Sequence, residues 1–134
     1  WSPSLGVTDP ASTANQVALA LARLAALEAR DPDRRAFVFV NVSALHQPNS
    51  IFAPGAHGAR GPDTPDTMLE ALAYVDGHLG ALVRAMRRRG PVLAVITSDH
   101  GTAYGEDGYH GHRLAHPSVW TVPYAERLLG ASTP

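Results

Sequence analysis

The chain contains no cysteine, so neither disulfides nor thiolate chemistry contribute to its fold or its site. No apolar run reaches the roughly 18 residues that a membrane-spanning helix needs, and the amino end lacks the charged-then-apolar pattern of a secretory signal. The formal net charge of -1 argues against the strongly basic surface typical of general nucleic-acid binding. We therefore expect no nucleic-acid partner and no membrane span, and the sequence leaves the compartment open.

The composition is that of an ordinary globular protein. Apolar residues make up 45% of the 134 positions, which is enough for one hydrophobic core, and no internal repeat divides the chain. The sequence predicts a single α/β domain over residues 1–134. Because the chain begins with Trp1 rather than Met, we expect either a processed product or a piece of a longer protein.

Two helices are predicted from apolar residues that recur at three- and four-residue steps. The first covers residues 11–30, with Ser12 or Thr13 as its N-cap. The second covers residues 65–89 and follows Thr64, another capping residue. The apolar stripe of the second helix consists of Met68, Leu72, Val75, Leu79, Leu82, Val83 and Met86.

Two strands are predicted around the second helix. Residues 36–42 are rich in Val and Phe, and residues 92–97 show no polar alternation, as in a strand that is covered on both faces of a parallel sheet. With a right-handed helical crossover between them, the two strands would be parallel neighbours or near neighbours. The predicted fold class is a three-layer α/β/α sandwich with a mainly parallel sheet. Residues 118–123 suggest a further short strand, and residues 124–129 the start of a helix.

Candidate site residues follow the predicted strand ends, where open α/β folds bind ligands. Asp99 and His100 come directly after the second strand, and a carboxylate beside an imidazole suits a divalent cation. His46 follows the first strand in the same way. His110 and His112 lie in the next loop, together with His116.

A loop rich in Pro and Gly, residues 47–66, is predicted to form a mobile flap over this site. His57 and Arg60 would reach an anion from the flap, or would simply be solvated.

The stretch from Ser98 to His112, which reads SDHGTAYGEDGYHGH, resembles the carboxyl-terminal metal motif of the alkaline phosphatase/sulfatase superfamily. The turn at His46-Gln47-Pro48 is similar to the His-x-Pro turn of that superfamily. The segments Tyr74–Gly80 and Val122-Pro123 are similar to its helix before the metal strand and its segment after the metal loop. Thr102 departs from the Glu that often follows the Gly, so the resemblance points to no single subfamily.

The resemblance implies roles for individual residues. Asp99 and His100 would bind a catalytic divalent metal, namely zinc, manganese or calcium. His112 would contact the anionic ester or bind a second metal, with His110 as the competing candidate because the loop spacing is loose. His46 would contact the charged oxygens of the substrate, a small-molecule, lipid-headgroup or sugar ester.

The function implied is hydrolysis or transfer of phosphate or sulfate esters. In that superfamily the nucleophile lies in an earlier half of the protein, and here no Ser or Thr stands on a recognisable nucleophile turn before the first strand. The resemblance therefore implies that this chain is the carboxyl-terminal part of a larger catalytic domain, with the nucleophile in a missing amino-terminal half of the same protein. The isolated chain is accordingly expected to be poorly soluble and almost inactive. The alternative is a noncatalytic α/β domain, or a degenerate fragment, with a His-rich loop that binds metal adventitiously.

Overall fold

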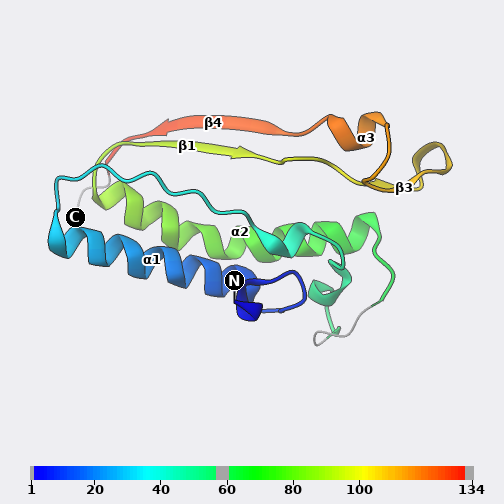
Figure 1. The fold of residues 1–134 in the computed structure, drawn as a ribbon, viewed down its shortest axis with the longest axis horizontal. Coiled ribbons are helices and arrows are strands. Elements are labelled where there is room, and N and C mark those ends of the chain that lie inside the picture. Colours follow the sequence, from blue (N-terminus) through cyan, green and yellow to red (C-terminus); the bar gives the residue numbers. More distant parts are fainter. Residues whose placement is uncertain (1, 57–60, 132–134) are drawn as a thin grey trace.

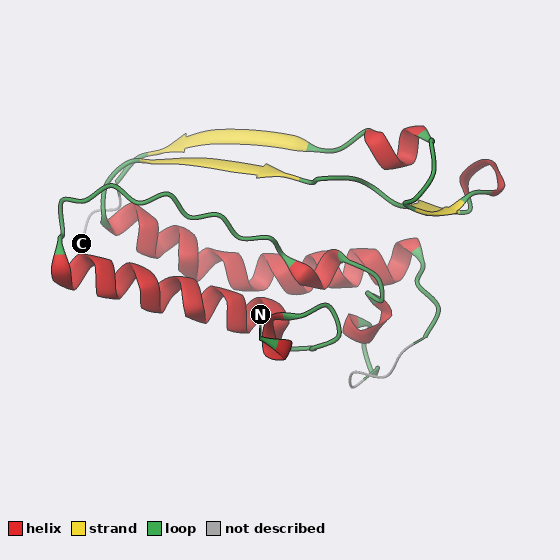
Figure 2. Cartoon of the chain, viewed as in Figure 1, coloured by secondary structure: helices red, strands yellow, loops and turns green. Residues whose placement is uncertain are grey.

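The protein has a mixed α/β structure, described by a computed structural model for residues 2–56 and 61–131 (Figure 1). Two long helices lie side by side in one layer, and a two-stranded ribbon runs along one side of that layer (Figures 1 and 2). In chain order the helices and strands are α1 (Ser12–Arg30), α2 (Pro65–Arg88), β1 (Val92–Thr97), β2 (Ala103–Tyr104), β3 (His110–Gly111), α3 (Pro117–Trp120) and β4 (Tyr124–Leu129). Single 3-10 turns cover Pro3–Leu5, Ser43–Leu45, Ser50–Phe52 and Glu106–Gly108.

Helix α1 confirms the first predicted helix but not its predicted cap. Its N-cap residue is Ala11, and the hydroxyls of Ser12 and Thr13 are buried without a hydrogen-bond partner among the described residues. The cap prediction is wrong because Asp9 acts instead: its Oδ1 accepts a hydrogen bond from the Ala11 backbone N–H at 2.7 Å. A free N–H at the start of the helix is thus satisfied from two residues upstream.

Helix α2 begins as the sequence predicts. Thr64 and Thr67 form a reciprocal capping box, and Pro65 occupies the first turn, where its missing N–H is not needed. The predicted apolar stripe is correct at Val75 and Leu82 but wrong at Leu72, which is 50% exposed. The small residue next to it, Ala71, takes the packed position and is fully buried.

The hydrophobic core lies between the two helices and the segment that joins α1 to the rest of the chain. Val17 and Leu24 of α1 form a buried cluster with Leu82 and Ala85 of α2. Partly buried side chains close around this cluster: Ala20, Leu21, Ala36, Val38, Val40, Leu79 and Met86.

The predicted strand at residues 36–42 is extended but is not part of any sheet in the described structure. Its side chains alternate: Ala36, Val38 and Val40 face the core, while Phe37 and Phe39 are 93% and 77% exposed. None of its backbone groups is hydrogen-bonded to another backbone group of the described residues. The local pattern therefore predicted the extended conformation correctly, but the pairing with the second strand is wrong, because no described strand reaches this backbone.

Strand β1 lies where the sequence predicts it, but its environment differs from the prediction. It pairs with β4 in antiparallel orientation, with Val92 opposite Leu129 and Thr97 opposite Tyr124, so the predicted parallel sheet is not formed by the described residues. The expected burial on both faces is also wrong, since Leu93 is 65% exposed. A three-layer arrangement is absent from residues 2–56 and 61–131 because nothing there covers the outer face of the ribbon.

The carboxyl-terminal predictions are reversed. Residues 118–123 do not form a strand, since Pro117–Trp120 is the short helix α3, and the residues expected to start a helix form β4. Ala125, Glu126 and Arg127 have weak strand preference, and pairing with β1 overrides it. No helix in the described part of the chain is both long and apolar enough to cross a membrane.

Candidate functional site

The candidate site lies beyond the carboxyl end of β1, where Ser98–Gly101 turns away from the strand. The Gly101 N–H donates to the Val119 carbonyl at 2.7 Å, which ties this turn to α3. A Cβ atom at position 101 would lie 2.1 Å from the Ser118 carbonyl oxygen. Only glycine permits this close approach, so Gly101 fixes the path of the loop that carries the polar residues.

Asp99 and His100 are oriented by their own backbone. The His100 backbone N–H donates to Asp99 Oδ1 at 3.0 Å, and His100 Nδ1 lies 2.9 Å from the Gly101 carbonyl oxygen. Because a carbonyl only accepts, Nδ1 carries the hydrogen, and in the neutral ring Nε2 then keeps its lone pair. Asp99 Oδ2 lies 3.8 Å from this Nε2. A carboxylate oxygen and an imidazole nitrogen, both available as ligands, are thus neighbours.

His46 is prepared in the same way, from a distant part of the sequence. It follows the turn Ser43–Leu45, which is anchored where Ser43 Oγ donates to the Leu5 carbonyl at 2.9 Å. His46 Nδ1 lies 2.6 Å from the Gln47 carbonyl oxygen, so Nδ1 again carries the hydrogen and Nε2 is free to accept or to bind a metal. The side chain is exposed.

His112 lies between the other two imidazoles. Its ring stacks on that of His100, with centroids 4.6 Å apart and planes inclined by 20°, and meets that of His46 edge-on at 5.7 Å. Burial lowers the pKa of His112 below its ordinary value, helped by the nearby His100, His46 and Arg113 and opposed by Asp99. His112 is therefore biased toward the neutral form, which accepts hydrogen bonds and binds metals.

His110, the competing candidate, lies apart from these three rings. It pairs with Tyr104 across the small β2–β3 hairpin, is exposed, and places its ring next to Gly105. Among the described residues no ring contact joins His110 to His46, His100 or His112. We call the set of Asp99, His46, His100 and His112 the histidine cluster; it contains four of the five residues predicted for the site.

The histidine cluster fits a divalent metal only in part. Asp99 Oδ2 and His100 Nε2 suit one ion, as two of the four or more ligands that such ions need. His112 does not complete the set, because the lone pairs of two stacked rings lie in nearly parallel planes and do not converge on one point. Within residues 2–56 and 61–131, no group of three or more His, Cys, Asp or Glu is arranged to hold a metal ion.

Two polar residues support the loops in a role that was not predicted. His116 is 9% exposed; its Nδ1 bonds to Ser118 and its Nε2 to Asp107 at 3.1 Å, which links the hairpin to the start of α3. The order His-Pro at residues 116 and 117 is the signal that would have identified it as a helix cap. Asn49 is fully buried, and its position in a Pro-rich loop gave no sign of that.

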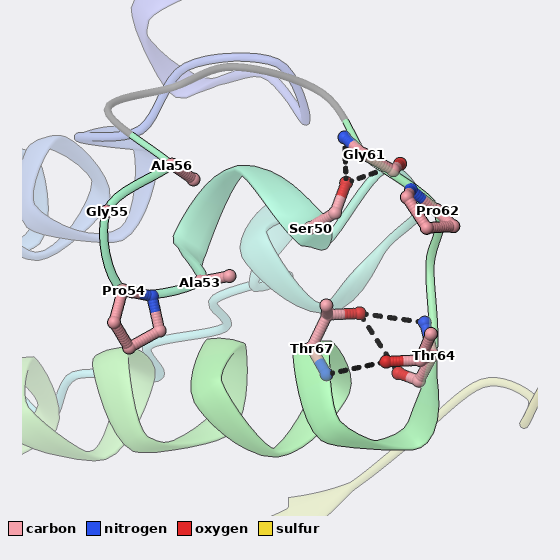
Figure 3. A pocket seen from close by; sticks show the side chains of 9 residues that line it. All are labelled: Ser50, Ala53, Pro54, Gly55, Ala56, Gly61, Pro62, Thr64 and Thr67. Carbon is pink, nitrogen blue, oxygen red and sulfur yellow. Dashed lines mark hydrogen bonds between the residues drawn. The ribbon is translucent and has the colours of Figure 1, made fainter.

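The predicted flap supplies no part of the site. His57 and Arg60 lie outside the described residues. An open hollow of about 440 Å³ lies beside the start of α2, and none of the histidine cluster lines it (Figure 3). Its hydroxyls are occupied by the protein: Ser50 Oγ bonds to the Gly61 backbone, and Thr64 and Thr67 cap α2. The hollow therefore offers few free polar groups to a ligand.

Comparison with known proteins gives no identification. No family model, no curated protein and no solved structure matches this chain.

Proposed function

We propose that the chain is part of a metal-dependent hydrolase or transferase acting on phosphate or sulfate esters, similar to the alkaline phosphatase/sulfatase superfamily. The observation that carries the proposal is the histidine cluster. His46 and His112 are 66 positions apart in the sequence, yet their rings lie in edge-on contact. Both His46 and His100 keep Nε2 free through a backbone hydrogen bond at Nδ1, as ligand histidines usually do.

The proposed chemistry divides the roles within the cluster. Asp99 and His100 would hold a divalent ion, zinc, manganese or calcium, which lowers the pKa of a bound nucleophile and polarises the ester. His46 would contact the charged oxygens of the ester. His112, biased toward its neutral form, would accept a hydrogen bond from the protonated ester or nucleophile, or bind a second metal. The role of His110 would be secondary, because it lies outside the cluster.

The proposal includes a larger domain, a three-layer α/β/α sandwich with a mainly parallel sheet, completed by an amino-terminal half that supplies the nucleophile. The support is the incomplete bonding of residues 36–42, whose backbone has no backbone partner among the described residues. Phe37, Phe39 and Leu93 are exposed, as expected for a sheet face that lacks its covering helices. Such an extended segment accepts further strands without changing its conformation.

The second candidate is a noncatalytic α/β domain with a His-rich loop. The stacking of His100 on His112 favours it, because this arrangement needs a rotation of one ring before both can bind one ion. A domain of this kind would bind metals weakly, with no preference for Asp99 over other surface carboxylates.

Calorimetric titration of the protein with Zn²⁺, Mn²⁺ and Ca²⁺ distinguishes the two candidates. We expect one equivalent to bind, and binding to be lost in both Asp99→Ala and His100→Ala. His78→Ala is the matched control, since His78 lies on α2 with its Nδ1 2.8 Å from the Tyr74 carbonyl. Binding that is unaffected by the first two substitutions would rule out the proposed metal site. If the titration supports the metal site, assays of the complete protein with an aryl phosphate and an aryl sulfate would show which ester it hydrolyses.

A further inference from the structure

A fully buried amide, Asn49, joins three elements of the structure. Its Oδ1 accepts from Thr67 Oγ1 at 2.6 Å, at the first turn of α2. Its Nδ2 donates to the hydroxyl of Tyr104, in β2, at 2.8 Å. Its backbone N–H and that of Ser50 both donate to Asp63 Oδ1, at 2.8 and 2.9 Å. Both polar atoms of this side chain therefore make a hydrogen bond inside the protein.

The bond from Asn49 to Tyr104 connects the two loops that carry the histidine cluster. Asn49 lies three residues after His46, and Tyr104 is paired with His110 in the hairpin that leads to His112. It is the one hydrogen bond between residues 43–56 and residues 98–121 in the described part of the chain. The contact between the rings of His46 and His112 spans the same two loops.

We propose that Asn49 and Tyr104 are positioning residues that hold His46 against His112; the catalytic meaning of this contact rests on the proposed function. Asp63 and Thr67 fix Asn49 to the start of α2, so the His46 turn stays in place when the bond to Tyr104 is removed. Among the described residues, the hairpin has no second hydrogen bond to that turn. Loss of the Tyr104 hydroxyl therefore separates the two loops without unfolding either one.

The environment of Tyr104 suits this role. Desolvation raises the pKa of Tyr104 above its ordinary value, with a further contribution from the nearby Asp63 and Glu106 carboxylates, while the bond from Asn49 acts in the opposite direction. The hydroxyl is consequently neutral at physiological pH.

The test compares Tyr104→Phe with Tyr74→Phe, the same loss of one hydroxyl at a tyrosine on α2 that accepts a 3.4 Å bond from the Ala14 backbone. The readout is the nuclear Overhauser effect between ring protons of His46 and His112 in the metal-free protein. We expect the effect to be present in the native protein and in Tyr74→Phe and to be lost in Tyr104→Phe. An undiminished effect in folded Tyr104→Phe overturns the proposal.

A second variant and a second probe test the positioning role of Asn49 and Tyr104 independently of the proposed metal site. Asn49→Ala removes the same bond from the other side and is expected to lose the same effect. Mn²⁺ bound at Asp99 and His100 is expected to broaden the ring resonances of His46 less in Tyr104→Phe than in the native protein, at unchanged Mn²⁺ affinity. Equal broadening in both counts against the positioning role. A native protein that binds no Mn²⁺ overturns the metal proposal instead, and the Overhauser effect still decides the role of Asn49 and Tyr104.

Discussion

The two faces of residues 36–42 differ sharply although they belong to one short segment. Val38 and Val40 pack on the core between α1 and α2, while Phe37 and Phe39 are almost fully exposed. The larger side chains are thus on the solvent side, which is the reverse of what a finished surface shows. The difference teaches that the helix layer buries one face of this segment and leaves two aromatic side chains of the other face in solvent.

Substitution in the hydrophobic core between α1 and α2 has the largest expected effect on stability. Leu24→Ala leaves a cavity at the centre of the α1–α2 cluster and is expected to lower the free energy of unfolding by about 2–5 kcal/mol. Leu19→Ala on the same helix is the control, because Leu19 is 45% exposed, and it is expected to change stability by less than about 1 kcal/mol. Urea unfolding followed by circular dichroism measures both. Equal losses would mean that the two faces of α1 do not differ in packing.

Gly101→Ala tests whether the site loop depends on close packing as the helix layer does. The added Cβ meets the Ser118 carbonyl, so the backbone must shift, at an expected cost of about 1–3 kcal/mol. Gly77→Ala in α2 meets nothing within 4 Å and is expected to stabilise the helix by about 0.5–1 kcal/mol. A lower midpoint of thermal unfolding for Gly101→Ala and a higher one for Gly77→Ala would support the difference in packing between the two positions. An unchanged midpoint for Gly101→Ala would contradict the tight turn.

The sequence predicted most where local chemistry decides the structure. The capping pair at Thr64 and Pro65 defines the start of α2 without help from the rest of the chain. The strand β4 was missed because its pairing with β1 spans about thirty residues, and weak local preference for helix lost to that pairing. For residues 36–42 the local pattern gave the conformation, but pairing requires a partner that no local pattern supplies.

The candidate site divides in the same way. The places of Asp99, His100 and His46 beyond extended segments were predictable, because the residue types of those segments are informative. The choice of His112 over His110 was not, since it depends on which residue of a short hairpin faces the other loop. The hydrogen bonds of Asn49 link elements that are distant in the sequence. A single asparagine in a Pro-rich loop carries no sequence signal for such bonds.

Polar substitution on the uncovered face is expected to have little effect on folding and a clear effect on association. Phe37→Ser with Phe39→Ser removes exposed apolar surface, so the free energy of unfolding is expected to change by less than about 1 kcal/mol. Self-association, measured by size exclusion with light scattering, is expected to fall. Val38→Ser is the matched control on the other face and is expected to destabilise the chain. A large stability loss in the Phe variant would show that this face is already covered.

The smallest expected effect is the pH dependence at His112. Its folded-state pKa lies below the ordinary value of about 6.5, first because burial penalises the charged ring and then because His100 and His46 repel a further charge. Between the folded and unfolded pKa the unfolded chain binds more protons, so this residue lowers stability as the pH falls through 6.5 and has no such effect above it. Titration of the His112 ring by NMR should give a midpoint below 6.5, and separating His112 from His46 by Tyr104→Phe should raise that midpoint. A midpoint at or above the ordinary value would mean that His112 is more exposed, and the three rings farther apart, in solution than in this structure.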